Sequence, residues 1–203
     1  MLITFEGIEA SGKSTLIATL ASDLRNRNID VHVTREPGGT PLGDRVRSLF
    51  LDPALLIDPV AEAFLINASR AQLVNDVIGP ALRAGQLVLC DRFFDATVAY
   101  QGFGRGLDVD MLVQLCLVAT RHISPDLTLL LDIPAELSCE RVRARGALDR
   151  LEGEALAFHD RVRQGYLRLA ERFPRIVVLD GTLAPEVLAS QARGAIQRHG
   201  GAV

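Results

Sequence analysis

The segment G-I-E-A-S-G-K-S at residues 7–14 constrains the fold more than any other part of the sequence. It fits the pattern G-x-x-x-x-G-K-[S/T], in which backbone N–H groups wrap phosphate oxygens, the lysine reaches the β- and γ-phosphates and the hydroxyl holds Mg²⁺. An apolar run at 2–5 precedes it and a helical pattern at 13–26 follows it, which disfavours a chance glycine turn. The sequence therefore predicts an ATP site formed by Gly7, Ile8, Glu9, Ala10, Ser11, Gly12, Lys13, Ser14 and Thr15.

Two residues of this loop are unusual. Lys13 is the only lysine among the 22 lysine and arginine residues, and codon composition alone can explain such an excess of arginine. A lysine that remains is expected to need a compact ammonium on a flexible stem. Glu9 places a carboxylate inside an anion-binding loop, and its simplest interpretation is a solvated loop residue.

Further apolar runs recur along the chain, at residues 31–34, 87–90, 127–131 and 176–179. Short, nearly continuous runs of this kind are typical of strands buried on both faces of a parallel sheet. Helical patterns separate them, at residues 13–26, 41–50, 59–83 and 108–121. The alternation predicts an α/β fold of the doubly wound P-loop NTPase type.

The sequence also predicts where some side chains of these helices lie. Val60, Phe64, Ala71 and Ile78 are expected to share one face of the longest helix. Pro134 and Pro185 suit the first turns of two later helices. Met111, Leu112, Leu115 and Val118 are expected to pack in the core, or alternatively to face a partner subunit.

Composition narrows the class of protein. A length of 203 residues without repeat or linker suits a single domain spanning 1–203. A net charge of −3 gives no support for a nucleic-acid polymer as partner. No stretch of about 18 apolar residues and no secretory leader is visible, so no membrane association and a cytoplasmic location are expected. The three cysteines form no C-x-x-C pair, so reduced thiols are expected rather than zinc ligands.

The loops that follow the predicted strands carry the polar residues. In doubly wound sheets, ligands bind at the carboxyl ends of the strands, so these loops are expected to meet at one edge. Asp91 ends the run L-V-L-C-D and is predicted to reach the metal, directly or through water. Its alternative role is to cap the following helix.

An arginine-rich segment suggests a kinase. Arg141, Arg143, Arg145 and Arg150 crowd ten residues around Gly146. Such a run can be a solvated helix end, but it also suits a lid, at about 141–152, that closes over ATP and offers guanidinium to the moving phosphoryl group. A guanine-reading N-K-x-D motif is absent, which argues against a GTPase switch, so a small phosphotransferase is predicted.

A set of motifs between residues 5 and 152 is more specific: F-E-G-I-E-A-S-G-K-S-T, T-R-E-P-G-G-T, S-R-A-Q-L, D-R-F, T-V-A-Y-Q-G and R-A-R-G-A-L-D-R-L-E, with D-G-T at 180–182. Together they resemble the thymidylate kinases, of the bacterial type with an arginine-rich lid. The resemblance implies a five-stranded parallel sheet, a homodimer, Mg²⁺ as cofactor, and transfer of the γ-phosphoryl group of ATP to dTMP, giving dTDP.

The resemblance also implies roles for individual residues. Arg92 would grip the acceptor phosphate, Arg145 would act from the lid with Arg150 and Arg143 next, and Lys13 and Asp91 would complete the catalytic set. The dTMP site would comprise Glu9, Arg35, Pro37, Arg47, Ile66, Arg70, Arg92, Thr97, Tyr100 and Gln101. Gly181 and Thr182 would flank adenine, and the metal would meet Ser14, Asp91 and, through water, Glu9. The Glu36–Pro37 bond is a candidate for the cis form.

Two points refine this expectation. Glu9 would stand on the acceptor side and bind the deoxyribose 3′-hydroxyl, which explains a carboxylate in this loop. Ile66 occupies the position where family members often carry a phenylalanine that stacks on thymine, so looser stacking is expected. Two alternatives stay open. One is another nucleoside-monophosphate or deoxynucleoside kinase, although Arg92 beside Asp91 favours a phosphorylated acceptor over a bare nucleoside. The other is a non-catalytic nucleotide-binding regulatory module.

Overall fold

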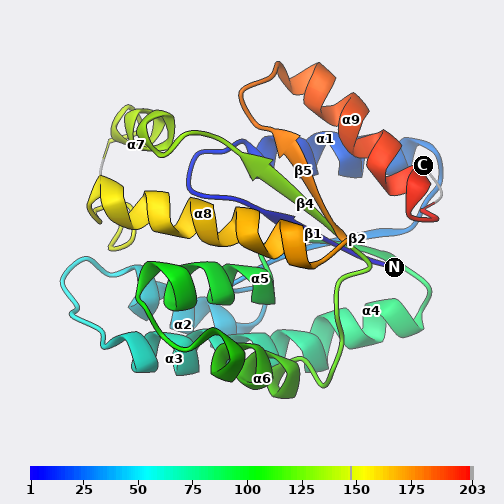
Figure 1. Ribbon diagram of the computed structural model, residues 1–203. Coiled ribbons are helices and arrows are strands. Elements are labelled where there is room, and N and C mark those ends of the chain that lie inside the picture. Colours follow the sequence, from blue (N-terminus) through cyan, green and yellow to red (C-terminus); the bar gives the residue numbers. More distant parts are fainter. Residues whose placement is uncertain (147, 202–203) are drawn as a thin grey trace.

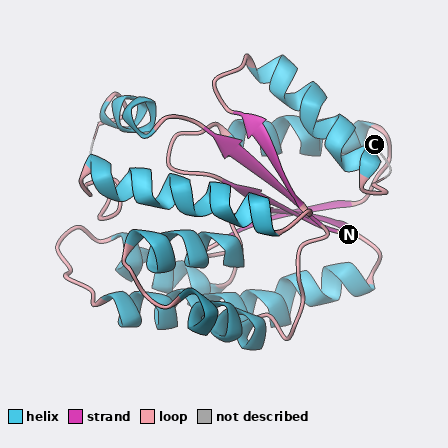
Figure 2. Cartoon of the chain, in the orientation of Figure 1, coloured by secondary structure: helices cyan, strands magenta, loops and turns pink. Residues whose placement is uncertain are grey.

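Five parallel strands form one sheet through the middle of the molecule (Figures 1 and 2). The computed structural model describes residues 1–146 and 148–201, so Ala147 of the predicted lid lies outside the described residues. The strands are β1 (Leu2–Glu6), β2 (Val31–Arg35), β3 (Leu87–Asp91), β4 (Leu127–Asp132) and β5 (Ile176–Asp180), in the order β2-β3-β1-β4-β5. The predicted fold class is confirmed.

Helices cover both faces of the sheet (Figure 1). On one face lie α1 (Lys13–Asn26) and α9 (Pro185–Arg198), which share a core with alternate residues of the strands. The other elements are α2 (Pro41–Leu51), α3 (Pro59–Leu73), η1 (Val74–Ile78), α4 (Gly79–Arg83), α5 (Phe94–Thr97), η2 (Val98–Gly104), α6 (Val109–Ala119), α7 (Ala135–Arg143) and α8 (Leu156–Arg172). No helix in the described part of the chain is long and apolar enough to cross a membrane.

Every strand continues one residue beyond its apolar run and ends on a charged side chain. These five residues are Glu6, Arg35, Asp91, Asp132 and Asp180. Backbone pairing needs no apolar side chain, so the ladder extends to the edge where the sheet meets solvent. The two outer strands are less buried than predicted, because β2 and β5 each have only one neighbour and expose Val33 and Val178.

The predicted helix at 59–83 is continuous, but its middle differs from expectation. Residues 74–78 form a π-helical turn, in which the N–H of Gly79 bonds to the carbonyl of Val74 five residues earlier. Pro80 follows directly and has no N–H for the regular ladder, which suits a wider turn here. The predicted face is wrong for Val60 and Phe64, which are exposed, because polar Asn67 and Arg70 share the buried face with Ala63 and Leu73.

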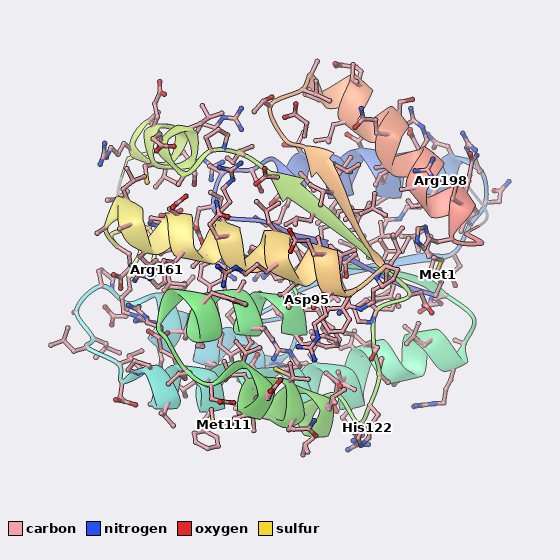
Figure 3. All side chains as sticks on the ribbon, in the orientation of Figure 1. Met1, Asp95, Met111, His122, Arg161 and Arg198 are labelled. Atoms are coloured by element: carbon pink, nitrogen blue, oxygen red, sulfur yellow. The ribbon has the colours of Figure 1, made fainter. Side chains whose placement is uncertain are left out.

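The predicted helix at 108–121 is found as α6, which Asp108 caps by accepting a hydrogen bond from the N–H of Met111. Leu112 is fully buried, as expected for a core position, whereas Met111 and Val118 are exposed. Met111 lies on the side of α6 that faces away from the sheet (Figure 3). Pro185 begins α9 as predicted, and Pro134 stands at the cap position just before α7.

Candidate active site

The phosphate loop connects β1 to α1. Gly7 and Gly12 have φ angles of 132° and 101°, a region that favours glycine, and a Cβ on Gly7 would lie 2.4 Å from the carbonyl oxygen of Leu131. Gly12 caps α1, so the positive end of that helix points into the loop. The geometry is that of an anion site.

Lys13 is buried within its own loop. Its ammonium donates hydrogen bonds to the carbonyl oxygens of Gly7 at 3.0 Å and Ile8 at 2.9 Å, and to the hydroxyl of Ser11 at 3.3 Å. Burial, reinforced by the charge of Arg92, lowers the pKa of Lys13 from 10.5 to about 8. Burial thus makes the charged form easier to lose, while the three acceptors hold the ammonium against the loop.

The expected metal ligands are partly assembled. The hydroxyl of Ser14 donates to Asp91 Oδ2 at 3.2 Å, so strand β3 and helix α1 present two oxygen ligands side by side. Mg²⁺ prefers oxygen ligands and usually takes one or two carboxylates, keeping its other positions for phosphates and water, so this pair fits Mg²⁺. Over the described residues, no cluster of three or more His, Cys, Asp or Glu side chains could hold a metal ion.

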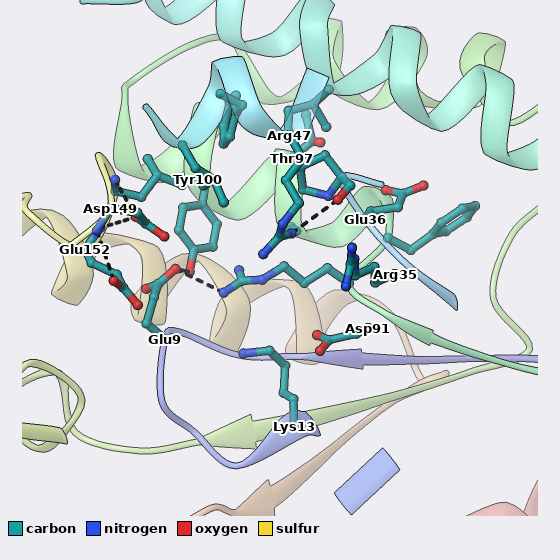
Figure 4. Close-up of a pocket in the computed structure, with 18 of the residues that line it drawn as sticks. Glu9, Lys13, Arg35, Glu36, Arg47, Asp91, Thr97, Tyr100, Asp149 and Glu152 are labelled. Carbon is teal, nitrogen blue, oxygen red and sulfur yellow. Dashed lines mark hydrogen bonds and ion pairs between the residues drawn. The ribbon is translucent and has the colours of Figure 1, made fainter. Parts of the chain in front are cut away.

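Glu9 points to the other side of the loop. In Figure 4 it lies opposite Asp91 across Lys13 and faces Tyr100. Its Oε1 accepts hydrogen bonds from Tyr100 Oη at 2.6 Å and from Arg92 Nη2 at 3.0 Å. Burial alone would raise the pKa of Glu9, but Arg92, His159 and Tyr100 outweigh it and hold that pKa well below its usual range. The carboxylate is thus fixed in its charged form beside the predicted acceptor residues.

Arg92 is held in a strained backbone conformation. Its φ angle is 67°, a left-handed value that is uncommon for residues other than glycine, and its N–H donates to the carbonyl of Phe5. The guanidinium lies 4.8 Å from the centre of the Tyr100 ring. The turn after β3 therefore directs this side chain into the pocket, where Tyr100 and Glu9 hold it.

Arg70 lines the pocket and is 1% exposed. It donates to Glu36 and Thr97 at 2.8 and 2.9 Å, and further bonds reach Asn67, Cys116 and the carbonyl of Phe93. These five bonds match the five N–H donors of a guanidinium. Arg70 therefore holds Thr97 and Glu36 in fixed orientations.

One pocket collects most of the predicted residues (Figure 4). Of the residues predicted to serve ATP and the metal, it is lined by Ala10, Lys13, Ser14 and Asp91, and of those predicted to serve dTMP, by Glu9, Arg35, Pro37, Arg47, Ile66, Arg70, Arg92, Thr97, Tyr100 and Gln101. Arg145 lines it from the segment after α7. Arg47 donates to the carbonyl of Pro37 at 3.2 Å, and the Glu36–Pro37 bond is cis, as expected.

Other predicted residues lie outside this pocket. Arg143 is exposed, and Arg150 points toward Glu62, to which it bonds at 2.5 Å, and toward the carbonyl of Phe50. Gly181 lies behind the phosphate loop, where a Cβ on it would be 3.1 Å from the carbonyl oxygen of Ser11, and Thr182 next to it is exposed. The residues predicted to flank adenine are therefore separate from the pocket.

Several residues of the site were not predicted. The pocket is also lined by Glu36, Phe50, Leu51, Phe93, Ala96, Asp149, Leu151 and Glu152. Behind it, buried Glu62 accepts hydrogen bonds from Gln101 and Arg105. Glu62 precedes Ile66 by four residues and Arg70 by eight, so helical spacing could have placed it on their face.

A phosphate loop at a strand–helix junction, a strand-end carboxylate beside its serine and an adjoining pocket lined by arginines define a P-loop phosphotransferase. The family described as thymidylate kinase matches residues 5–192. The thymidylate kinase of Deinococcus radiodurans is 49% identical over 98% of both chains, and that of Desulfovibrio desulfuricans is 49% identical over 98% of this chain and 96% of its own. The crystal structure of thymidylate kinase from Ehrlichia chaffeensis superposes with a TM-score of 0.79 at 33% identity, covering 97% of this chain and 98% of its own.

The chain belongs to the thymidylate kinase family. It is a nucleoside-monophosphate kinase that uses ATP to phosphorylate dTMP to dTDP. The predicted family is confirmed, and nothing supports the alternatives, another kinase of the same class or a non-catalytic module.

Proposed function

We propose that the phosphate loop is a wall shared by both substrates, with Lys13 serving ATP and Glu9 serving dTMP. The observation that carries this proposal is that a single pocket is lined by Lys13, Ser14 and Asp91 as well as by Arg92 and Arg145. Both substrates are polyanions and the acceptor is already a phosphate, so no strong general base is required. Catalysis would come from positioning and charge neutralisation.

On the donor side, the loop from Gly7 to Thr15 would hold the phosphates of ATP, with adenine beside Gly181 and Thr182. Ser14 and Asp91 would hold Mg²⁺, which offers positive charge to the phosphate oxygens when bound. Glu9 would reach the metal only through water, since its carboxylate bonds to Arg92 and Tyr100.

On the acceptor side, Arg92 would bind the phosphate of dTMP, supported by Arg35, Arg47 and the turn at Pro37. Tyr100 would pack near the deoxyribose, and Glu9 would accept a hydrogen bond from its 3′-hydroxyl.

Thymine would lie against Ile66, Thr97 and Gln101. Arg70 has an acceptor for each of its N–H groups, so it would contact the base only by sharing a donor, and its larger role would be to orient Thr97. The weak bond from Arg70 to Cys116 sulfur, at 3.4 Å, is the one most easily shared.

The chain would form a single domain, residues 1–203, with a lid at about 141–152. Arg145 would reach the transferring phosphoryl group from this lid. Arg150 and Arg143 are weaker candidates, because Arg150 is paired with Glu62 and Arg143 is exposed outside the pocket. Arg141 donates to the carbonyl of Ala10 at 3.1 Å, so it would join the lid to the phosphate loop.

Arg145→Ala is expected to lower kcat by about 10²-fold or more, with smaller changes in both KM values, because a lid guanidinium acts mainly on the transition state. The measurement is a coupled ADP-release assay with dTMP and ATP each varied. The control variant is Arg198→Ala, which removes the same charge at an exposed position in the last turn of α9 and should leave kcat unchanged. If Arg145→Ala kept kcat within about threefold, a catalytic role for Arg145 would fail.

The protein would act as a homodimer in the cytoplasm. Val60 and Phe64 on α3 and Met111 and Val118 on α6 are exposed, and these two helices pack against each other. Apolar side chains gathered on neighbouring helices suit a subunit interface. The three cysteines are free thiols, which suits a reducing compartment.

Phe64→Glu is expected to convert a dimer to a monomer, because a carboxylate would be buried without a partner at the interface. Sedimentation velocity at matched concentrations measures the change. Leu56→Glu places the same charge on a side chain fully exposed in the loop before α3, and it should leave the dimer intact. A wild-type protein that sediments as a monomer would overturn the dimer proposal.

A further inference from the structure

His159 lies in α8, directly behind Glu9, and the motifs of the sequence assign it no role. Its side chain is 2% exposed and does not line the pocket. The ring packs edge-on against Phe158, with centroids 5.6 Å apart. Its Nδ1 lies 3.5 Å from Glu9 Oε2. A buried, polar ring therefore lies against the buried carboxylate oxygen Oε2 of Glu9.

Three polar atoms at this contact lack hydrogen-bond partners within the described structure. They are Glu9 Oε2 and both ring nitrogens of His159, and all three are buried. An unpaired buried polar group costs about 1–3 kcal/mol. Such groups are rare in folded proteins and need an explanation when they gather at a functional site.

The rest of Glu9 is already fixed. Its carbonyl oxygen accepts a hydrogen bond from Ser138 Oγ at 2.7 Å, which joins the loop to α7. Its Oε1 takes the two bonds from Arg92 and Tyr100. Oε2 is the only polar atom of this side chain that those contacts do not hold, and His159 is the group beside it.

We propose that His159 is a positioning residue for Glu9: its Nδ1–H anchors Oε2 in the protein wall and keeps Oε1 turned into the pocket. This inference rests on the proposed contact between Glu9 and the 3′-hydroxyl of dTMP. A carboxylate offers about four lone-pair sites, and Arg92 and Tyr100 occupy the two on Oε1, so the 3′-hydroxyl would share or replace one of those two bonds when dTMP binds. Without His159, no donor within the described structure would lie beside Oε2, and the carboxylate would turn away toward solvent or Lys13 and lose its alignment with the sugar.

The test compares dTMP with its 3′-deoxy analogue, 2′,3′-dideoxythymidine 5′-monophosphate, as acceptor. His159→Phe keeps an aromatic ring, slightly larger than imidazole, and removes the donor. It is expected to raise the KM for dTMP about 10-fold, the effect of one hydrogen bond to a charged group, with kcat and the KM for ATP changing less. The KM for the 3′-deoxy analogue should stay within about twofold, and His159→Asn, which returns an N–H near Nδ1, should restore the KM for dTMP.

Glu9→Ala serves as the reference variant. It should raise the KM for dTMP more than that for ATP, and leave the 3′-deoxy analogue less affected. Equal increases for both acceptors in Glu9→Ala would refute the proposed sugar contact itself. If Glu9→Ala distinguishes the acceptors but His159→Phe does not, only the role of His159 is wrong. Should His159→Phe fail to fold, His159→Leu removes the same donor and the same comparison decides.

Discussion

Lys13→Ala is expected to lower kcat by about 10³-fold or more at any concentration of ATP, because the lysine charge neutralises the phosphates at the point of transfer. No neighbouring side chain can replace it, since Lys13 is the only lysine in the chain and Arg92 is already paired with Glu9. The measurement is kcat with both substrates saturating, alongside a thermal melt that confirms the folded state.

Lys13→Arg distinguishes charge from shape. The ammonium lies 3.0 and 2.9 Å from two carbonyl oxygens in a position that is 7% exposed, so a planar guanidinium would displace the loop. We expect this variant to remain at least about 10²-fold below wild type. Full activity in Lys13→Arg would show that positive charge alone suffices, and the retention of one lysine would need another explanation.

Arg92→Ala is expected to reduce kcat/KM for dTMP by about 10²–10³-fold, because the proposed phosphate contact and the partner of Glu9 are lost together. Burial would then act on Glu9 without the opposing charge of Arg92, so the pKa of Glu9 would rise toward its ordinary range. Steady-state kinetics with dTMP varied at saturating ATP measures kcat/KM for dTMP.

Arg92→Gly is the matched control for stability. It removes the same side chain, but glycine adopts the φ angle of 67° without strain, so the glycine variant should be more stable than the alanine variant by about 1 kcal/mol. Both variants should be equally impaired in activity. A glycine variant that kept kcat/KM within about tenfold of wild type would show that the guanidinium is not needed for binding dTMP.

The fold could be predicted from the sequence because its strands are continuous apolar runs. Each prediction ended one residue early, since hydropathy stops at a charged residue such as Asp91 while the backbone ladder does not. Motif residues at the strand ends were also placed well, because the loops after parallel strands must meet at one edge, whereas the site residues on α2, α3, α5 and η2 were placed by the resemblance to thymidylate kinases. The sequence thus located the pocket and most of its lining.

The remainder depends on contacts that no local pattern encodes. Glu6 meets Tyr166, and Glu9 meets His159, across about 150 residues of chain. Arg145 was favoured over Arg150 through the family resemblance, and no local pattern shows the reason for their different positions: only Arg145 of the two lines the pocket, because Glu62 holds Arg150 elsewhere. Helical periodicity identifies a face, not the partner that it meets.

The saturated guanidinium of Arg70 has a consequence for the polarity of the base site. The oxygen of Thr97 accepts a hydrogen bond from Arg70, so the hydroxyl proton of Thr97 remains available as a donor. Because Arg70 occupies one of the two lone pairs of the Thr97 oxygen, we expect the hydroxyl to meet the base mainly as a donor, which would favour a ring edge bearing a keto oxygen over one bearing an amino group. A buried arginine would thus influence the choice between keto and amino pyrimidines through the direction of a threonine hydroxyl.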